Sequence, residues 1–133
     1  MKVVTLLRQF VSTFGYMSAL CLALTFSGPV SASDWKEIDT ERQLAYLILH
    51  AVDWGQTRNI AKNPDEFYEF NPLLGTHPSV KRVDSYMLVS ALTHTAISYF
   101  LPRDWRHAFQ HITLSVKSGL VDHNFSIGLR IDY

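Results

Sequence analysis

The strongest constraint on the fold is a proline-rich segment in the middle of the chain, residues 53–79, which reads DWGQTRNIAKNPDEFYEFNPLLGTHPS. Three of the five prolines of the whole sequence lie between residues 64 and 78. A residue that precedes proline is pushed out of the α-helical conformation, so a helix that enters this segment must end at Asn63. The segment therefore separates two helical patterns, and its polar side chains make it our candidate functional region.

The first 32 residues have the composition of an export signal. Lys2 and Arg8 form a positively charged start, residues 10–26 are apolar, and Ala32 follows Val30-Ser31 in a signal-peptidase-like site. Cleavage after Ala32 would leave a single domain, residues 33–133. The alternative is an uncleaved anchor, because the apolar stretch is nearly long enough to cross a bilayer.

Hydrophobic periodicity predicts an all-α fold, in which a signal helix precedes a three-helix bundle with a proline-rich central loop. The three helices are expected at about residues 40–62, 80–101 and 105–121. Residues 125–133 alternate between apolar and polar side chains, as strands do, so we expect a short extended C-terminal tail.

Local sequence signals set the expected helix ends. Thr40 and Gln43 have the spacing of a capping box, in which each side chain satisfies a free backbone N–H at the start of the first helix. Ser79 is the expected N-cap of the second helix, and Pro102 stops that helix. Asp104 is the expected cap of the third helix.

The charge balance and the cysteine count narrow the choice of function. The chain has 12 basic and 12 acidic residues, and loss of Lys2 and Arg8 with the signal would leave 10 basic against 12 acidic. Nucleic acid is therefore not an expected partner, because it requires a basic patch. The one cysteine, Cys21, lies inside the signal. A mature chain without disulfides depends on its core, a metal, a partner or a membrane.

One face of the first predicted helix carries candidate binding residues at positions i, i+4, i+7 and i+11: Tyr46, His50, Asp53 and Thr57. A buried aspartate must be paired, hydrogen-bonded or protonated. In a functional interpretation, Asp53 acts as an acid, base or ligand together with His50 and Thr57. In a structural interpretation, Asp53 anchors the helix to the loop through Arg58 or the backbone amides near Asn71.

The central loop supplies the other candidates. Its two proline breaks let the chain reverse, so we expect Glu69, Asn71 and His77 to return to the Asp53 face. Turn formation alone explains Asn71, whose side chain can bond to its own turn, but not Glu69 or His77. The full candidate binding set consists of polar residues of the first two helices and the loop: His50, Asp53, Gln56, Thr57, Glu69, Asn71, His77 and His94.

An alternative function is metal or haem binding. His107 and His111 have the i, i+4 spacing that allows two imidazoles to share one metal on a helix. A third ligand would have to come from His94, His123, Asp122 or Asp53, and the alternative names His94 or Asp53. Because the expected mature chain has no cysteine and no recognisable nucleophile motif, an enzyme is the less favoured interpretation and no catalytic residue is assigned.

The composition of the second predicted helix indicates a membrane protein. Residues 86–101 contain no charged side chain, although about 20 apolar residues are needed for a full span. Basic residues of the central loop also fit the positive-inside rule. Polar faces of the other two helices are compatible with a membrane bundle if they turn inward. We therefore expect a non-enzymatic cell-envelope protein in or on the inner membrane, with a protein or lipid partner.

The motif residues also carry a resemblance. The strings Asp53-Trp54-x-Gln56-Thr57 and Glu69-x-Asn71-Pro72-x-x-Gly75-x-His77-Pro78-Ser79 resemble a pattern of uncharacterised small exported and multi-helix membrane proteins of Gram-negative bacteria. In general layout the resemblance covers most of residues 45–130. It implies a helical membrane protein and no particular activity.

Overall fold

The computed structural model describes residues 34–133, which form three α-helices: α2 (Glu37–Lys62), α3 (Val80–Phe100) and α4 (Arg103–Ser126). The prediction of an all-α three-helix bundle is confirmed, and no strand occurs within this described part. The expected signal or anchor at residues 1–32 lies outside the described residues.

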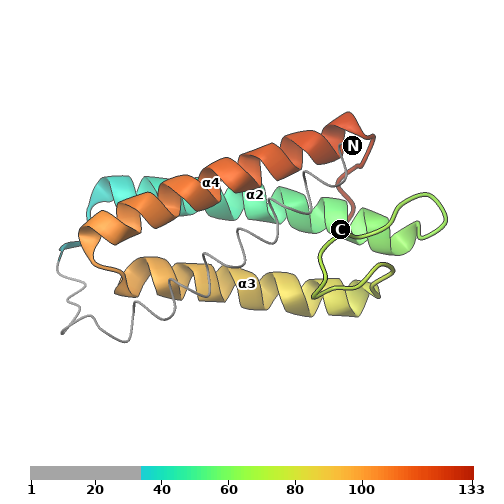
Figure 1. Cartoon of the computed structure of the whole chain (residues 1–133), viewed down its shortest axis with the longest axis horizontal. Coiled ribbons are helices and arrows are strands. Elements are labelled where there is room, and N and C mark those ends of the chain that lie inside the picture. The colour runs from blue at the N-terminus through green and yellow to red at the C-terminus, as the bar shows by residue number, and fades with distance from the viewer. Residues whose placement is uncertain (1–33) are drawn as a thin grey trace. The chain divides into compact units, whose positions relative to one another are not determined.

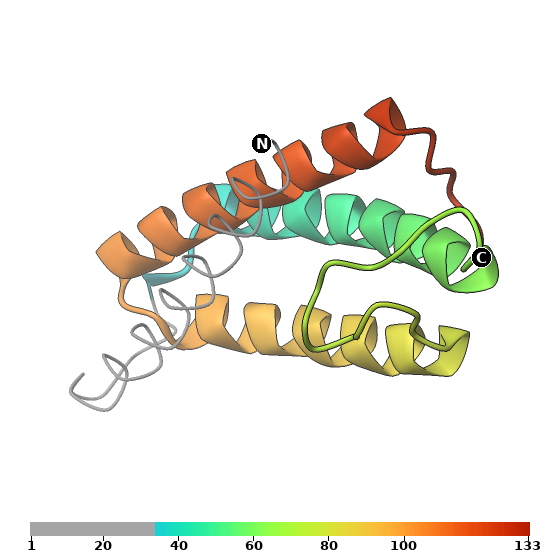
Figure 2. The same ribbon diagram turned by 45° about the vertical axis from the view of Figure 1, so that its right-hand side comes forward.

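Helix α2 is the centre of the bundle, because it packs along both other helices (Figure 1). Helices α3 and α4 are joined by the short connection at Pro102 and diverge from it, so that they meet mainly near that corner (Figure 2). The inner face of α2 therefore looks into the angle between α3 and α4. The central loop, residues 63–79, returns along the opposite end of the bundle (Figures 1 and 2).

The ends of α3 and the end of α2 follow the predicted signals. Ser79 Oγ accepts a hydrogen bond from the Arg82 amide at 3.3 Å, and α3 ends before Pro102. Helix α2 ends at Lys62, directly before the Asn63-Pro64 break. These signals depend only on neighbouring residues, which is why the sequence predicts them well.

The predicted start of α2 is wrong. The helix begins at Glu37, and the Asp39 carboxylate accepts a hydrogen bond from the Lys36 amide at 3.0 Å. Thr40 Oγ1 accepts a bond from the Trp35 indole at 2.8 Å instead of capping the helix. The other half of the expected capping box, Gln43, is buried between the helices.

Helix α4 is longer than predicted, and its predicted cap is wrong. Pro102 occupies the N-cap position, while Asp104 lies inside the first turn. The helix continues to Ser126, through the first residues of the expected tail. The side chains of α4 that turn into the bundle are mixed in character: Arg106, Gln110, Thr113, Lys117 and Val121.

The C-terminal tail is extended, as predicted, but it pairs with a helix and not with another strand. After a turn at Gly128 (φ +91°), it runs along α2. The Asp132 amide donates to the Gly55 carbonyl at 3.1 Å, and the Tyr133 hydroxyl donates to the Ala51 carbonyl at 2.7 Å. Gly55 is required there, because a Cβ would lie 2.5 Å from Ile131 Cγ2.

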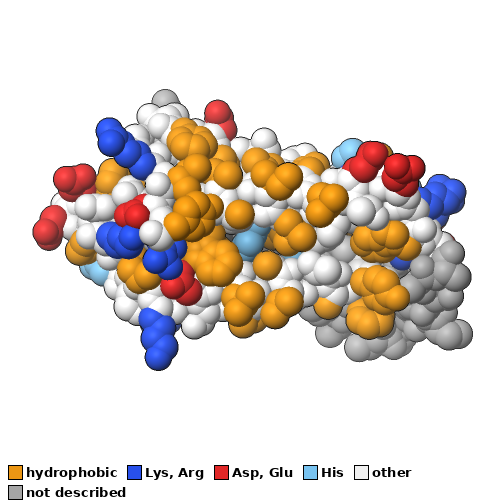
Figure 3. Space-filling view, turned by 180° about the vertical axis from the view of Figure 1, so that it is seen from behind, with side chains coloured by type: hydrophobic (Ala, Val, Ile, Leu, Met, Phe, Trp, Pro, Cys, Tyr) orange, Lys and Arg blue, Asp and Glu red, His pale blue; other side chains and the backbone are white. Residues whose placement is uncertain are grey.

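The interior of the bundle is rich in polar side chains, and many large apolar side chains are exposed. The apolar core is small and consists of Leu74, Val83 and Met87, with partly buried neighbours. Among residues 34–133, eleven polar or charged residues are buried, against ten hydrophobic ones besides Pro78. Large apolar side chains are instead exposed along the helices, including five on α3: Leu88, Val89, Leu92, Tyr99 and Phe100. Figure 3 shows apolar side chains spread over one face of the molecule.

Within residues 34–133, none of the helices combines the length and the hydropathy that crossing a membrane requires.

Candidate functional site

The predicted polar face of α2 does look into the bundle. Tyr46, His50, Asp53 and Thr57 are all buried, and each is at most 8% exposed. Residues of α3, α4 and the loop complete a polar interior around this face. We define this set as the interior polar cluster: Tyr46, His50, Asp53, Gln56, Thr57, Glu69, His94, Lys117 and Asn124.

An ion pair between α2 and α4 forms the centre of the cluster. Lys117 Nζ lies 2.7 Å from Asp53 Oδ2, with only 13% and 12% of the two side chains exposed. Burial alone lowers the pKa of Lys117, but the Asp53 carboxylate outweighs this effect and raises it, so the ammonium stays charged. The pair satisfies the requirement of Asp53 for a partner.

The prediction that the central loop or Arg58 supplies this partner is wrong. Within residues 34–133, Asp53 forms hydrogen bonds with Lys117 and also with the Asn124 amide at 3.4 Å, both from α4. The Arg58 guanidinium instead binds the Asp84 carboxylate of α3 at 2.6 Å. The bonds to Asp53 therefore hold helices together and do not dock the loop.

Gln56 belongs to the same connection between α2 and α4. Its Oε1 accepts a hydrogen bond from the Asn124 side chain at 3.0 Å, and its Nε2 donates to the Val121 carbonyl at 3.3 Å. The side chain is fully buried and both ends of its amide are bonded. Gln56 therefore links α2 to α4 through two hydrogen bonds.

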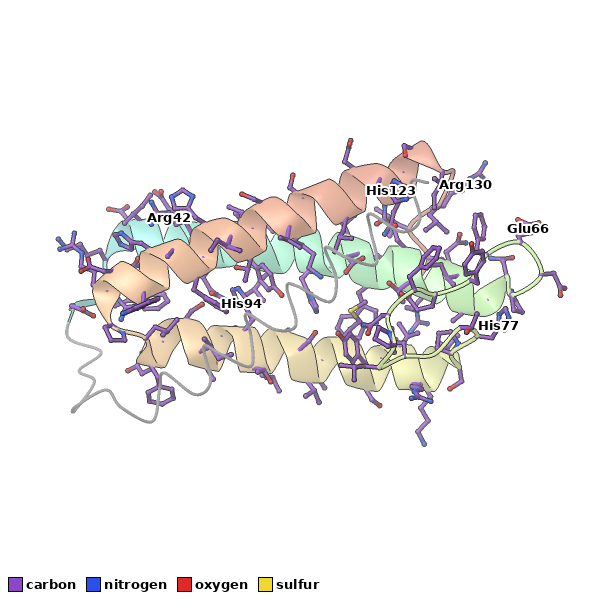
Figure 4. All side chains as sticks on the ribbon, in the orientation of Figure 1. Arg42, Glu66, His77, His94, His123 and Arg130 are labelled. Carbon is purple, nitrogen blue, oxygen red and sulfur yellow. The ribbon has the colours of Figure 1, made fainter. Side chains whose placement is uncertain are left out.

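Two buried histidines line the α3 side of the cluster. Figure 4 shows His94 pointing from α3 into the space between the helices. Its Nε2 lies 2.8 Å from Thr113 Oγ1, whose own proton is donated to the Phe109 carbonyl, so Nε2 is the protonated nitrogen. Its Nδ1 lies 3.3 Å from the Gln43 amide nitrogen and accepts that bond. Burial, with His50 and Lys117 nearby, lowers the pKa of His94 to about 3.

His50 has one bonded and one free ring nitrogen. Its Nε2 donates to the Met87 carbonyl at 2.9 Å, while its buried Nδ1 has no partner among residues 34–133. Burial and the nearby Lys117 charge lower the pKa of His50. Tyr46 stacks between the two histidines, with ring centroids 3.5 Å from His94 and 5.6 Å from His50. The pKa of Tyr46 is raised, mainly by burial.

The structure separates the three loop candidates. Glu69 Oε1 accepts a bond from the Asn71 amide at 2.8 Å, and the Glu69 amide donates to the Thr76 carbonyl. Burial raises the pKa of Glu69, and the Asp53 charge adds to this effect, whereas the hydrogen bond from the Asn71 amide opposes it. Asn71 is buried and caps its own turn at Leu73. His77 is exposed at the loop end of the molecule (Figure 4).

The residues named for the metal alternative are not gathered into one site within the described part of the chain. Across residues 34–133, no group of three or more His, Cys, Asp or Glu side chains is placed to hold a metal ion. His107 Nε2 lies 3.2 Å from Asp39 Oδ1, and His111 is exposed. His94 and Asp53 are engaged elsewhere, as described above.

Sequence reasoning missed a second polar junction, at the corner where α3 meets α4. Arg106 is fully buried and donates to the Ser98 and Leu101 carbonyls, each at 2.8 Å. Its guanidinium also binds Asp34 at 2.9 Å and Asp39 at 3.4 Å. One arginine thus joins the start of α2 to the end of α3. No local sequence pattern distinguishes a buried arginine from an exposed one in a helix that has both polar and apolar sides.

Comparisons with protein-family models, with curated proteins and with solved structures find no match. The resemblance to exported and membrane proteins of Gram-negative bacteria therefore stays a prediction. The interior polar cluster connects the three helices through hydrogen bonds and an ion pair. An apolar core would not provide such bonds.

Proposed function

We propose that this chain is a small non-enzymatic protein of the cell envelope, whose helical bundle lies on the inner membrane and contacts lipid. The observation that carries the proposal is a polar bundle interior beside an exposed apolar face on α3. Asp53, Lys117, His94 and Arg106 are buried, while the outer side of α3 exposes large apolar side chains. Polar groups of proteins in contact with hydrocarbon face the bundle interior in the same way.

The contact surface is the outer face of α3. Leu88, Val89, Leu92, Tyr99 and Phe100 are each between 46% and 62% exposed. The segment between residues 86 and 101 contains no charged side chain that would oppose contact with acyl chains. Contiguous exposed apolar surface of this kind marks a membrane or protein contact. The export signal expected at residues 1–32 supports a location in the envelope.

The proposal is tested by fractionation of cells that express the full chain. We expect the protein in the membrane fraction, and we expect alkaline carbonate to release it only in part, because the contact is apolar. Recovery of the protein in the soluble periplasmic fraction would contradict the proposal.

A pair of variants tests the surface itself. Leu88→Glu/Leu92→Glu places two charges on the outer face of α3 and should move the protein to the soluble fraction. The matched control, Ser115→Glu/Ser118→Glu, places the same charges on exposed positions of α4 and should leave it on the membrane. Circular dichroism of both variants shows whether the bundle is still folded. Equal release of the two folded variants would rule out α3 as the contact.

A further inference from the structure

The apolar strip of α3 has a basic end. Lys81 precedes Leu88, Leu92 and Tyr99 by 7, 11 and 18 positions, which places all four on one side of a helix. Lys81 and its neighbour Arg82 are both exposed. The outer face of α3 therefore passes from a cationic first turn to a long uncharged stretch.

The charges at this end are not neutralised by α3 itself. Asp84 is the only acidic residue of α3, and it is held by Arg58 at 2.6 Å and by the Trp54 indole at 2.7 Å, both from α2. Lys81 and Arg82 have no ion-pair partner among residues 34–133. The acidic loop residue Glu66 lies at the loop tip beyond the end of α2, away from α3 (Figure 4).

An exposed apolar residue of the loop, Leu73, lies next to Arg82. Arg82 Nη2 donates a hydrogen bond to the Leu73 carbonyl at 2.9 Å, and this bond holds the guanidinium against the loop. The Leu73 side chain is itself 46% exposed. Cations beside exposed apolar groups suit the boundary between lipid headgroups and acyl chains.

We propose that the outer face of α3 binds anionic phospholipid bilayers in preference to zwitterionic ones, with Lys81 and Arg82 against the headgroups. This inference rests on the proposed function, in which the same face contacts lipid. Basic side chains next to a membrane are attracted by the negative surface potential of anionic lipids, and each contributes about 1 kcal/mol. The preference should therefore depend on these two residues and on ionic strength.

The experiment measures co-sedimentation of the full chain with phosphatidylcholine vesicles, with and without phosphatidylglycerol. We expect tighter binding to the vesicles that contain phosphatidylglycerol, and a loss of this preference at high salt. Lys81→Gln should weaken binding to those vesicles about fivefold, and Lys81→Gln/Arg82→Gln about 25-fold, since about 1 kcal/mol per charge corresponds to these factors. Binding to phosphatidylcholine alone should not change.

The matched control is Arg130→Gln, which removes one exposed positive charge from the tail, on a side of the molecule remote from α3 (Figure 4). It should bind both kinds of vesicle as the unmodified chain does. Equal binding to both kinds of vesicle, or equal losses for Lys81→Gln and Arg130→Gln, would overturn this inference and leave the membrane contact intact. No binding to either kind of vesicle would overturn the proposed function as well.

Discussion

A lysine removed from water needs a negative partner within a few ångströms, because the free energy of desolvating an ammonium group is several kcal/mol. Lys117 meets this need through Asp53 at 2.7 Å, and its ammonium also lies 5.9 Å from the centre of the Tyr46 ring. Each member of the pair therefore depends on the other. The energetic cost of a substitution depends on whether it removes one charge or both.

Asp53→Leu should destabilise the protein by about 3 kcal/mol, because it leaves Lys117 charged, buried and unpaired. Asp53→Ala should cost at least as much, since it also leaves a cavity. The double variant Asp53→Leu/Lys117→Met should recover most of the loss, as apolar side chains can replace a buried pair. Urea unfolding of the purified proteins measures these differences. A double variant no more stable than Asp53→Leu would show that the two residues do not act as a pair.

The sequence predicts that Asp53 needs a partner but not which residue provides it. The requirement follows from one aspartate in an apolar helical pattern, and this can be recognised locally. The partner is 64 positions away, on a helix whose rotation about its own axis the sequence does not determine. Lys117 lies in a helix with both polar and apolar sides, so nothing in its surroundings marks it as buried. The same limitation applies to Arg106.

The C-terminal tail packs closely against α2 at Gly55, whose carbonyl accepts a hydrogen bond from the Asp132 amide. Gly55→Ala should release the tail, because the new Cβ would lie 2.5 Å from Ile131 Cγ2 and 3.3 Å from the Asp132 backbone nitrogen. Alanine stabilises a helix by about 1 kcal/mol relative to glycine, and this gain only partly offsets the loss of the tail contacts. Hydrogen exchange at the Asp132 amide, which donates to the Gly55 carbonyl, measures the release directly.

Gly119→Ala in α4 is the control for this experiment. A Cβ at Gly119 meets no atom within 4 Å, so the helical preference of alanine should stabilise the protein by about 0.5–1 kcal/mol. Protection of the Asp132 amide should not change. If Gly55→Ala also left the Asp132 amide protected, the tail would have adapted to the added methyl group, and the packing argument would fail.

Predictions of helix ends succeeded where the signal is local and failed where distant residues compete. Ser79 and the proline breaks act within a few residues, and the structure confirms them. Gln43 was expected to cap α2 but bonds to His94 and Thr95 across the interior. Alternation in residues 125–133 predicted an extended tail, yet α4 continues to Ser126 before the chain extends. Tertiary contacts override the local preference at Gln43, whereas the end of α4 is held by local bonds such as Ser126 Oγ to the His123 carbonyl at 2.7 Å.

At the scale of the whole molecule, buried polar groups make stability depend on protonation. His94 is the clearest case, because burial with His50 and Lys117 nearby lowers its pKa from 6.5 to about 3. Between these values the unfolded chain binds a proton at this histidine and the folded chain does not. The stability contributed by neutral His94 is therefore present above pH 6.5 and is lost as pH falls toward 3.

Lowering the pH from 7 to 5 should therefore reduce the free energy of unfolding by about 2 kcal/mol through His94 alone. His50, whose pKa is also lowered, acts in the same direction. Glu69 acts in the opposite direction, because its raised pKa makes the folded state bind a proton more readily.

Urea unfolding at pH 7 and pH 5 measures the sum of these contributions to the free energy of unfolding. His94→Gln should show a markedly smaller difference in this free energy between the two pH values. His111→Gln, an exposed control on α4, should retain the difference of the unmodified chain. A His94→Gln variant with an unchanged pH dependence would mean that this imidazole is not held neutral in the folded bundle.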